Sequence, residues 1–309
     1  MLKKYEGVNC YAMALINASE LIYPNFYKTV FYDAIRFTRV NLHNNFDFCN
    51  YEYEMTSTNS IVERLTKNLS IYFEEISSKE VKNIFVTGSN LFIAFIDVYY
   101  ADWIKRYYHK IHSIHTILLN VDVNETIMYD SSFLSKPIVF EEGKIESKLM
   151  KKVLKIKTNK HNKSIDKIIK MCWLQTIKLA KEETIHNQFI KFIELFYKHF
   201  NNRILQQGGD PFNNVLFDTV YTMTGNKKAF LEYVELINIK NMKKIDIQFK
   251  KIRTITNSTI RKLEEIKILI IYTFENGYKN ENHQYIYSKL LEVLDNEREM
   301  TKLIVEIEI

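Results

Sequence analysis

The stretch GVNCYAMALINASELIYPNFY, residues 7–27, decides how the fold begins. It predicts a helix over residues 10–21, because its apolar residues recur at three- and four-residue spacing, as in Ala14, Leu15, Ala18 and Leu21. Asn9 is expected to cap the first turn, and Pro24 ends the helix. Cys10 therefore lies where unpaired amides and the helix dipole favour a thiolate over a thiol.

The rest of the first half divides into helices followed by strands. Helical patterns continue over residues 26–37 and 59–76. From residue 81 onward, β-branched and aromatic residues predict strands over 81–87, 90–100, 115–121 and 125–130. The last two are close enough along the chain to form a β-hairpin.

The second half is predicted to be mainly helical from about residue 145. The stretch QQGGDPFNN, residues 206–214, interrupts that pattern. The simplest division is therefore an α+β domain over residues 1–145 and a mainly helical domain over 146–309. The dense basic run KLMKKVLKIKTNKHNK, residues 148–163, lies at this boundary, where we expect a solvated linker or a helix face.

Composition limits the classes of protein that this chain can represent. Apolar residues make up 46% of its 309 residues, with 20 Phe and 20 Tyr, so we expect the chain to fold throughout. No run reaches the ~18 to 20 apolar residues that span a bilayer, so we expect neither a membrane span nor a signal peptide. Three cysteines without framework spacing favour a reducing compartment, and hence a cytoplasmic protein.

The charge pattern bears on the expected partner. The formal net charge is +6, but the lysines are spread among acidic residues rather than gathered into one block. This pattern does not favour nucleic acid as a partner. A lysine-rich surface of this kind suits an acidic protein partner, because complementary charge speeds encounter.

A thiolate nucleophile needs a base and a third group that orients the base, and the hairpin supplies both. His115 begins its first strand and Asp130 ends its second. If the turn is centred between Asp122 and Val123, His115 lies directly opposite Asp130 and their side chains share a face. The sequence thus predicts a catalytic constellation of Cys10, His115 and Asp130.

Four short motifs carry a resemblance to a known family. They are GVNCYAMAL, FIDVYY, HSIHTILLNVD and IMYDSSF, all between residue 5 and about residue 140. Together they resemble the N-terminal domain of the butirosin biosynthesis protein H family, a branch of the papain-like cysteine-peptidase superfamily. The resemblance implies a papain-like fold of N-terminal helices and an antiparallel sheet.

The resemblance also implies an activity, because family members encoded beside nonribosomal peptide and polyketide genes are thought to be acyltransferases. It predicts transfer of an acyl or aminoacyl group from a carrier-protein thioester to an amine, in the biosynthesis of an antibiotic or a similar metabolite. Cys10 would be the nucleophile, His115 the base and Asp130 the orienting acid. The phosphopantetheine arm would arrive on an acyl or peptidyl carrier protein, so no cofactor of the chain's own is expected.

The remaining site residues follow from the same comparison and from their surroundings. Asp97, in the IDVYY motif, could line the acceptor site and hold an amine, with Tyr99 and His112 beside it. The family often has histidine where this chain has Asn9, and papain-like enzymes carry an oxyanion-hole glutamine upstream of the cysteine. Here only Lys3, Lys4, Tyr5 and Glu6 stand upstream, so the Cys10 amide and Asn9 would have to serve instead.

Several alternatives stay open at this point. With water as acceptor, the same residues would make a cysteine peptidase or a thioesterase. The missing glutamine favours a papain-like fold that only binds or acts as a scaffold. His109, His112 and His115 recur at three-residue spacing, but a strand beginning at His115 prevents them from sharing a helical face, so no metal site is expected. The long apolar helix faces are compatible with a homodimer.

Overall fold

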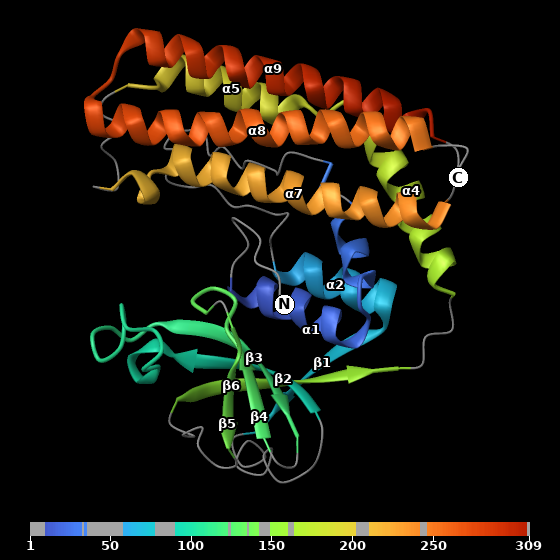
Figure 1. The fold of residues 1–309 in the computed structure, drawn as a ribbon, viewed down its shortest axis with the longest axis vertical. Helices are drawn as coiled ribbons and strands as arrows, with labels where there is room; N and C mark the ends of the chain where they lie inside the picture. The colour runs from blue at the N-terminus through green and yellow to red at the C-terminus, as the bar shows by residue number, and fades with distance from the viewer. Residues whose placement is uncertain are drawn as a thin grey trace. The chain divides into compact units, whose positions relative to one another are not determined.

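A computed structural model describes most of the chain, namely residues 10–32, 34–35, 58–77, 90–122, 125–134, 136–141, 149–159, 164–201, 210–241 and 246–307. The contacts among these residues form two compact units. The first unit contains the described residues of 8–27 and 57–162, and the second contains those of 28–56 and 163–309. The fold class is α+β, with an antiparallel sheet in the first unit and long helices in the second (Figure 1).

The first unit is built on a six-stranded antiparallel sheet with the strand order β1-β6-β2-β3-β4-β5. Its strands are β1 (Ile71–Ile76), β2 (Asn90–Asp97), β3 (Ile114–Val121), β4 (Glu125–Tyr129), β5 (Ile138–Glu141) and β6 (Met150–Thr158). Strands β2, β3, β4 and β5 follow one another as a meander. The late strand β6 inserts between β1 and β2, so the sheet joins segments that are far apart in the sequence.

Two helices belong to this unit, α1 (Cys10–Ile22) and α2 (Thr58–Leu69). They contact each other, and α1 packs on β3 and β2 whereas α2 packs on β1 (Figure 1). The predicted helix over 10–21 is confirmed, and residues Ala12 to Ser19 are all buried. A helix that is buried on every side is held in place by the surrounding fold, which fixes the position of its first residue, Cys10.

The two faces of the sheet bury different sets of side chains. Phe92, Ala94 and Ile96 of β2 share a face with Ile117 and Leu119 of β3, and their cluster also takes in residues 98–104 after β2. Phe95 points to the other face, where its ring meets the Tyr11 ring of α1 edge-on at a centroid distance of 4.8 Å. Helix α1 therefore covers the Phe95 face.

Two parts of the sheet differ from the prediction. The helix expected over 59–76 ends at Leu69, because Ser70 takes a left-handed conformation with φ 52°, and the next residues form β1. In this strand Ile71 is buried whereas Tyr72, Glu74 and Glu75 are exposed, and its backbone pairs with β6. The basic run expected to be a linker or helix face contains β6, in which Val153, Leu154 and Ile156 are buried between exposed lysines.

The boundary between the units also differs from the expected residue 145. Strand β6 pairs with β1 and β2, which extends the first unit through the described residues up to 159. Residues 28–32 and 34–35 belong to the second unit, although both flanking segments belong to the first. The helix expected over 26–37 is described as a 3-10 helix, Phe26–Phe31, and the strand expected over 81–87 lies outside the described residues.

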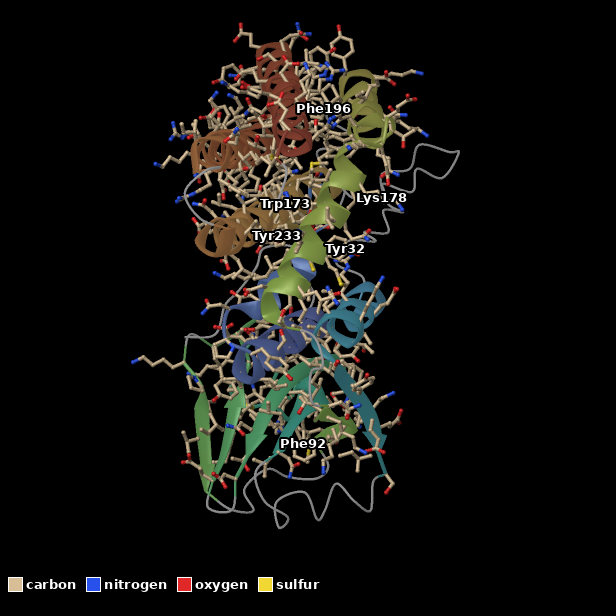
Figure 2. The ribbon with its side chains drawn as sticks, turned by 90° about the vertical axis from the view of Figure 1, so that its right-hand side faces the viewer. Tyr32, Phe92, Trp173, Lys178, Phe196 and Tyr233 are labelled. Atoms are coloured by element: carbon tan, nitrogen blue, oxygen red, sulfur yellow. The ribbon has the colours of Figure 1, made fainter. Side chains whose placement is uncertain are left out.

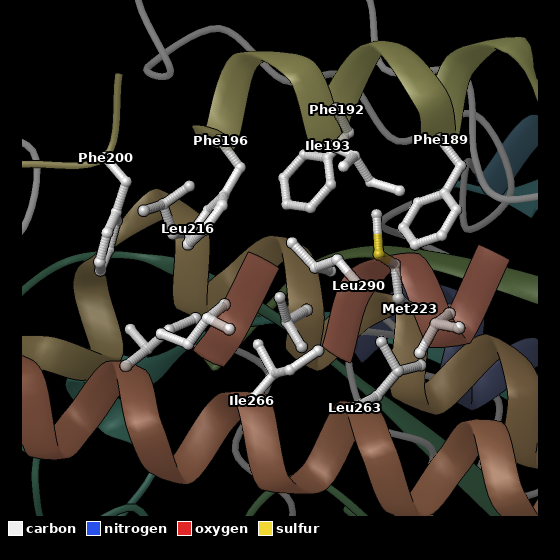
Figure 3. Packing of buried hydrophobic residues seen from close by; sticks show 14 of the residues in the cluster. Phe189, Phe192, Ile193, Phe196, Phe200, Leu216, Met223, Leu263, Ile266 and Leu290 are labelled. Carbon is white, nitrogen blue, oxygen red and sulfur yellow. The ribbon is translucent and has the colours of Figure 1, made fainter. Parts of the chain in front are cut away.

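The second unit is helical, as predicted for this half of the chain. Its long helices are α4 (Ile165–Ala180), α5 (Asn187–His199), α7 (Val215–Asn241), α8 (Asp246–Asn276) and α9 (Asn280–Val305), with a short 3-10 helix η4 (Pro211–Asn213) before α7. Gly277, with φ 80°, makes the tight link between α8 and α9. Figure 3 shows the core that these helices share, where Phe189, Phe192 and Phe196 of α5 lie over Ile266 and Leu290.

Polar groups in this interior tie residues 28–35 to the helices. Thr176 Oγ1 donates to the carbonyl oxygen of Tyr32 at 2.8 Å and lies 3.1 Å from the Tyr233 hydroxyl. Figure 2 labels Tyr32 and Tyr233, two partners of this side chain. Lys227 Nζ donates to the carbonyl oxygen of Ile35 at 3.0 Å and forms an ion pair with Glu297 at 2.6 Å. Both side chains of that pair are 0% exposed.

Candidate active site

Cys10 begins α1 and is partly buried against the start of β3. Its sulfur is hydrogen-bonded by the side chain of His115 and by both the side chain and the backbone amide of Thr116. Val98 N donates to Ser113 O across β2 and β3, and the hydrogen-bonded pairs of an antiparallel ladder alternate. The Thr116 amide therefore points away from β2, toward β4.

The thiol can reach this amide because β4 stops pairing with β3 before it reaches Thr116. The last pair between β3 and β4 is Leu118 with Tyr129, so the edge of β3 at Thr116 is open. The side chain of Asn17, further along α1, donates to Ser131 Oγ at 3.0 Å. This hydrogen bond ties the helix to the segment that follows β4 and holds Cys10 against the open edge.

His115 and Asp130 form a buried pair in which Nε2 lies 2.9 Å from Oδ1. Their side chains are 7% and 0% exposed. The prediction that they lie directly opposite each other is wrong: the pairing of Leu118 with Tyr129 centres the hairpin one residue later than expected. That displacement shifts the register by two residues, an even number, so both side chains keep the same face and meet diagonally.

The Asp130 carboxylate is held by four donors. Besides His115, Oδ1 accepts from the backbone amides of Ser132 at 3.2 Å and Phe133 at 3.3 Å. Oδ2 accepts from Trp103 Nε1 at 3.0 Å. Donors to an ionised carboxylate stabilise its charge, so Asp130 is available to orient His115 and to balance a positive charge on it.

The two nitrogens of His115 have different partners. Nε2 binds Asp130, so Nδ1 is the nitrogen left for Cys10. Burial alone would lower the pKa of His115, but the hydrogen bonds to Asp130 and Cys10 and the negative charges of both groups raise it to about 9. The Phe133 ring packs edge-on against the imidazole at a centroid distance of 5.0 Å.

The pKa of the Cys10 thiol shifts in the opposite direction. Burial alone would raise its pKa, but the hydrogen bond and positive charge of His115, together with the two hydrogen bonds from Thr116, lower it below the ordinary value of 9.0. This arrangement favours a thiolate beside an imidazolium, because each charge stabilises the other. Such a pair is a nucleophile that needs no further base to attack a carbonyl carbon.

The other predicted site residues form a second cluster beside this one. Asp97 ends β2, its side chain is 6% exposed, and Oδ2 lies 2.9 Å from His112 Nδ1. Tyr99 donates its backbone amide to Asp97 Oδ1 at 3.1 Å and stacks its ring on His112. Asp97 is thus enclosed, and the group that faces solvent is His112, which is 65% exposed. Asn9 lies outside the described residues.

Two contributors to the site were missed by sequence reasoning, Thr116 and Trp103. Thr116 could have been found, because it directly follows His115 at the start of the same strand. Trp103 lies 27 positions from its partner Asp130 and no local pattern joins them. Among the residues that the structure describes, no group of three His, Cys, Asp or Glu side chains could hold a metal ion.

The comparisons with known proteins return no match, either among protein-family models or among curated proteins. No described helix is long and apolar enough to cross a membrane. The chemistry of the site therefore has to be inferred from its geometry.

Proposed function

We propose that the protein is a cysteine-dependent acyltransferase with a papain-like first unit. The observation that carries this proposal is the hydrogen-bonded series Cys10, His115, Asp130, in which the thiol pKa is lowered and the imidazole pKa is raised to about 9. The fold supports it, since the cysteine begins a helix packed on an antiparallel sheet that carries the histidine and the carboxylate. The sequence motifs described above point to the same family.

The proposed reaction has two steps. In the first, the Cys10 thiolate attacks the carbonyl carbon of a thioester, the carbon–sulfur bond of the donor breaks, and the His115 imidazolium gives its proton to the departing thiolate. In the second, a neutral amine attacks the acyl carbon, the bond from that carbon to the Cys10 sulfur breaks, and the proton lost by the nitrogen goes to His115, which leaves an amide and restores the thiolate. Because a thioester is already activated, the protein mainly has to position the acceptor and exclude water.

Apolar side chains beside the catalytic pair fit an acyl donor. Phe133 touches the His115 ring yet is 44% exposed, and the neighbouring Ile114 is 57% exposed. Exposed apolar groups next to a nucleophile suit a substrate that brings apolar surface of its own. We infer an acyl or peptidyl carrier protein as the donor and a small-molecule amine as the acceptor.

The test uses a small thioester in place of the carrier protein. Wild-type protein is mixed with S-acetyl-N-acetylcysteamine, and intact-mass spectrometry follows acetylation of Cys10, with and without n-butylamine. We expect an acetyl adduct on Cys10 that forms N-butylacetamide when the amine is present. Cys10→Ser and His115→Ala should lose the adduct, while Cys172, which is 2% exposed, should stay unmodified.

The competing functions give other products. A thioesterase or peptidase would release acetate at the same rate whether or not the amine is added. A papain-like binding or scaffold module would form no adduct on Cys10 at all. Either result would overturn the proposed transfer.

A further inference from the structure

A second carboxylate–imidazole pair lies at the same end of the sheet as the first. Asp97 Oδ2 is 2.9 Å from His112 Nδ1 and 3.5 Å from Lys151 Nζ. The ladder between β2 and β6 has a bulge after Phe95 that leaves Lys151 unpaired, and bulges of this kind redirect a side chain. The pair differs from His115 and Asp130 in one respect, because its imidazole is exposed.

The contacts of His112 fix which of its nitrogens carries the proton. Burial alone would raise the pKa of Asp97, but the hydrogen bonds from His112 and the Tyr99 amide and the nearby positive charges lower it. An ionised carboxylate can only accept, so His112 Nδ1 must donate. In the neutral ring, Nε2 then carries a lone pair.

The His112 ring is also held in place by packing. The Tyr99 ring stacks on it at a centroid distance of 4.2 Å and an interplanar angle of 14°, and the Tyr100 ring approaches edge-on at 6.2 Å. The His112 side chain is 65% exposed although Nδ1 is bound to Asp97 and one face is stacked on Tyr99, so we infer that Nε2 lies on the solvent side. His112 therefore presents an oriented proton acceptor to solvent.

The strand register places this group next to Cys10. Phe95 pairs with Thr116 across β2 and β3. The start of α1 packs on this pair, because Tyr11 contacts Phe95 and Cys10 contacts Thr116. The next pair on the same face is Asp97 with Ile114. Two residues along a strand correspond to ~7 Å, so the Asp97 pair follows directly after the pair on which Cys10 lies.

The proposed transfer needs a second proton acceptor, and this inference rests on that proposed function. A basic amine at neutral pH is an ammonium ion, which has to lose one proton before it can attack and another after the bond to carbon forms. His115, once it has given its proton to the donor thiol, can accept only one.

We propose that His112 Nε2 takes the first of these protons from the acceptor ammonium and passes it to solvent. The free amine then forms a bond to the acyl carbon, the bond from carbon to Cys10 sulfur breaks, and the second proton goes to His115. The thiolate and imidazolium are thereby restored. Asp97 is a positioning residue, since it acts only through His112.

The test compares two amines with the S-acetyl-N-acetylcysteamine donor. n-Butylamine is an ammonium ion at pH 7, whereas hydroxylamine is already neutral and does not need the first proton transfer. The variant is His112→Gln. The matched control is His109→Gln, because His109 also stacks on Tyr99, at 5.1 Å, but forms no pair with Asp97.

We expect His112→Gln to acetylate Cys10 within twofold of the wild-type rate and to transfer to hydroxylamine normally. Its rate with n-butylamine should fall ~100-fold, the lower end of the range for one general base. His109→Gln should change none of the three rates.

Two outcomes overturn this inference alone. Normal acetylation with equal losses for both amines would assign His112 a positioning role only, and normal rates with both would assign it none. Failure of the wild-type protein to acetylate Cys10 would instead overturn the proposed function, and this inference with it.

Discussion

The substitution Asp130→Asn should lower the reactivity of the Cys10 thiol although it changes neither Cys10 nor His115. The asparagine keeps the size of the side chain but removes the negative charge that faces His115 Nε2. The pKa of His115 then falls from about 9 toward 6.5, and the imidazolium no longer stabilises the thiolate. Since burial of Cys10 by itself favours the thiol, we expect the thiol form to predominate in the variant.

The size of the effect follows from the raised pKa. A rise from 6.5 to about 9 corresponds to ~3 kcal/mol in favour of the charged imidazole. Asp130 and Cys10 supply it together, and a share of about 1 to 2 kcal/mol from the carboxylate corresponds to about a tenfold change in an equilibrium. Iodoacetamide alkylation of Cys10 at neutral pH should therefore slow by about tenfold.

The assay is the rate of carbamidomethylation at Cys10 against pH, read by peptide mass spectrometry. Asp97→Asn is the matched control, because it makes the same change in the other carboxylate–imidazole pair and should leave the rate unaltered. If Asp130→Asn alkylates within twofold of wild type while the protein stays folded, the thiolate does not depend on the buried pair and the reasoning fails.

Three further changes test described contacts other than the hydrogen bond between His115 and Asp130. Lys227→Met should destabilise the protein by ~3 to 5 kcal/mol in urea unfolding, because it removes the positive charge that is paired with the buried Glu297 carboxylate. Adding Glu297→Leu should recover most of that loss. Equal losses in the single and double variants would refute this. Burial and the positive charges of Lys227 and Arg298 lower the pKa of His186 to about 4, so folding stability should fall as the pH drops from 6.5 through about 4. Thermal unfolding across that range should be flatter in His186→Gln, and an unchanged slope would contradict the reasoning. Phe133→Ser should slow acylation of Cys10 by a long-chain N-acetylcysteamine thioester more than acetylation by the acetyl one, and equal slowing would show that Phe133 does not contact the acyl chain.

Much of the fold could be predicted because its signals are local. The helix that starts at Cys10 and the hairpin of β3 and β4 both follow from spacing within a single segment. The sequence pattern places the residues of β1 in the preceding helix, because their apolar residues fit the spacing of a helix as well as that of a strand. The left-handed residue that ends the helix is Ser70 rather than glycine, so it gives no sequence signal for a break. Strand β6 was hidden by its lysines, whose charge obscured the alternation with buried residues.

The candidate catalytic residues could be predicted from the sequence for a related reason. The faces of a hairpin depend only on whether the register shift is odd or even, so His115 and Asp130 stay on one face despite the misplaced turn. The contacts that support these residues could not be predicted from the sequence, because they join segments that are distant along the chain. Trp103 meets Asp130 across the fold, and Lys151 reaches Asp97 only because of the bulge in its strand.

The path of the chain between the two units limits how the protein can be divided. Residues 28–35 belong to the helical unit, but they follow α1 directly and precede the rest of the sheet unit. A fragment that starts after residue 163 would lack the Ile35 carbonyl that receives Lys227 Nζ. Because the two units alternate along the chain, one crossover in the gene could not exchange either unit as a whole. We therefore expect the cysteine helix and the helical unit to be inherited together.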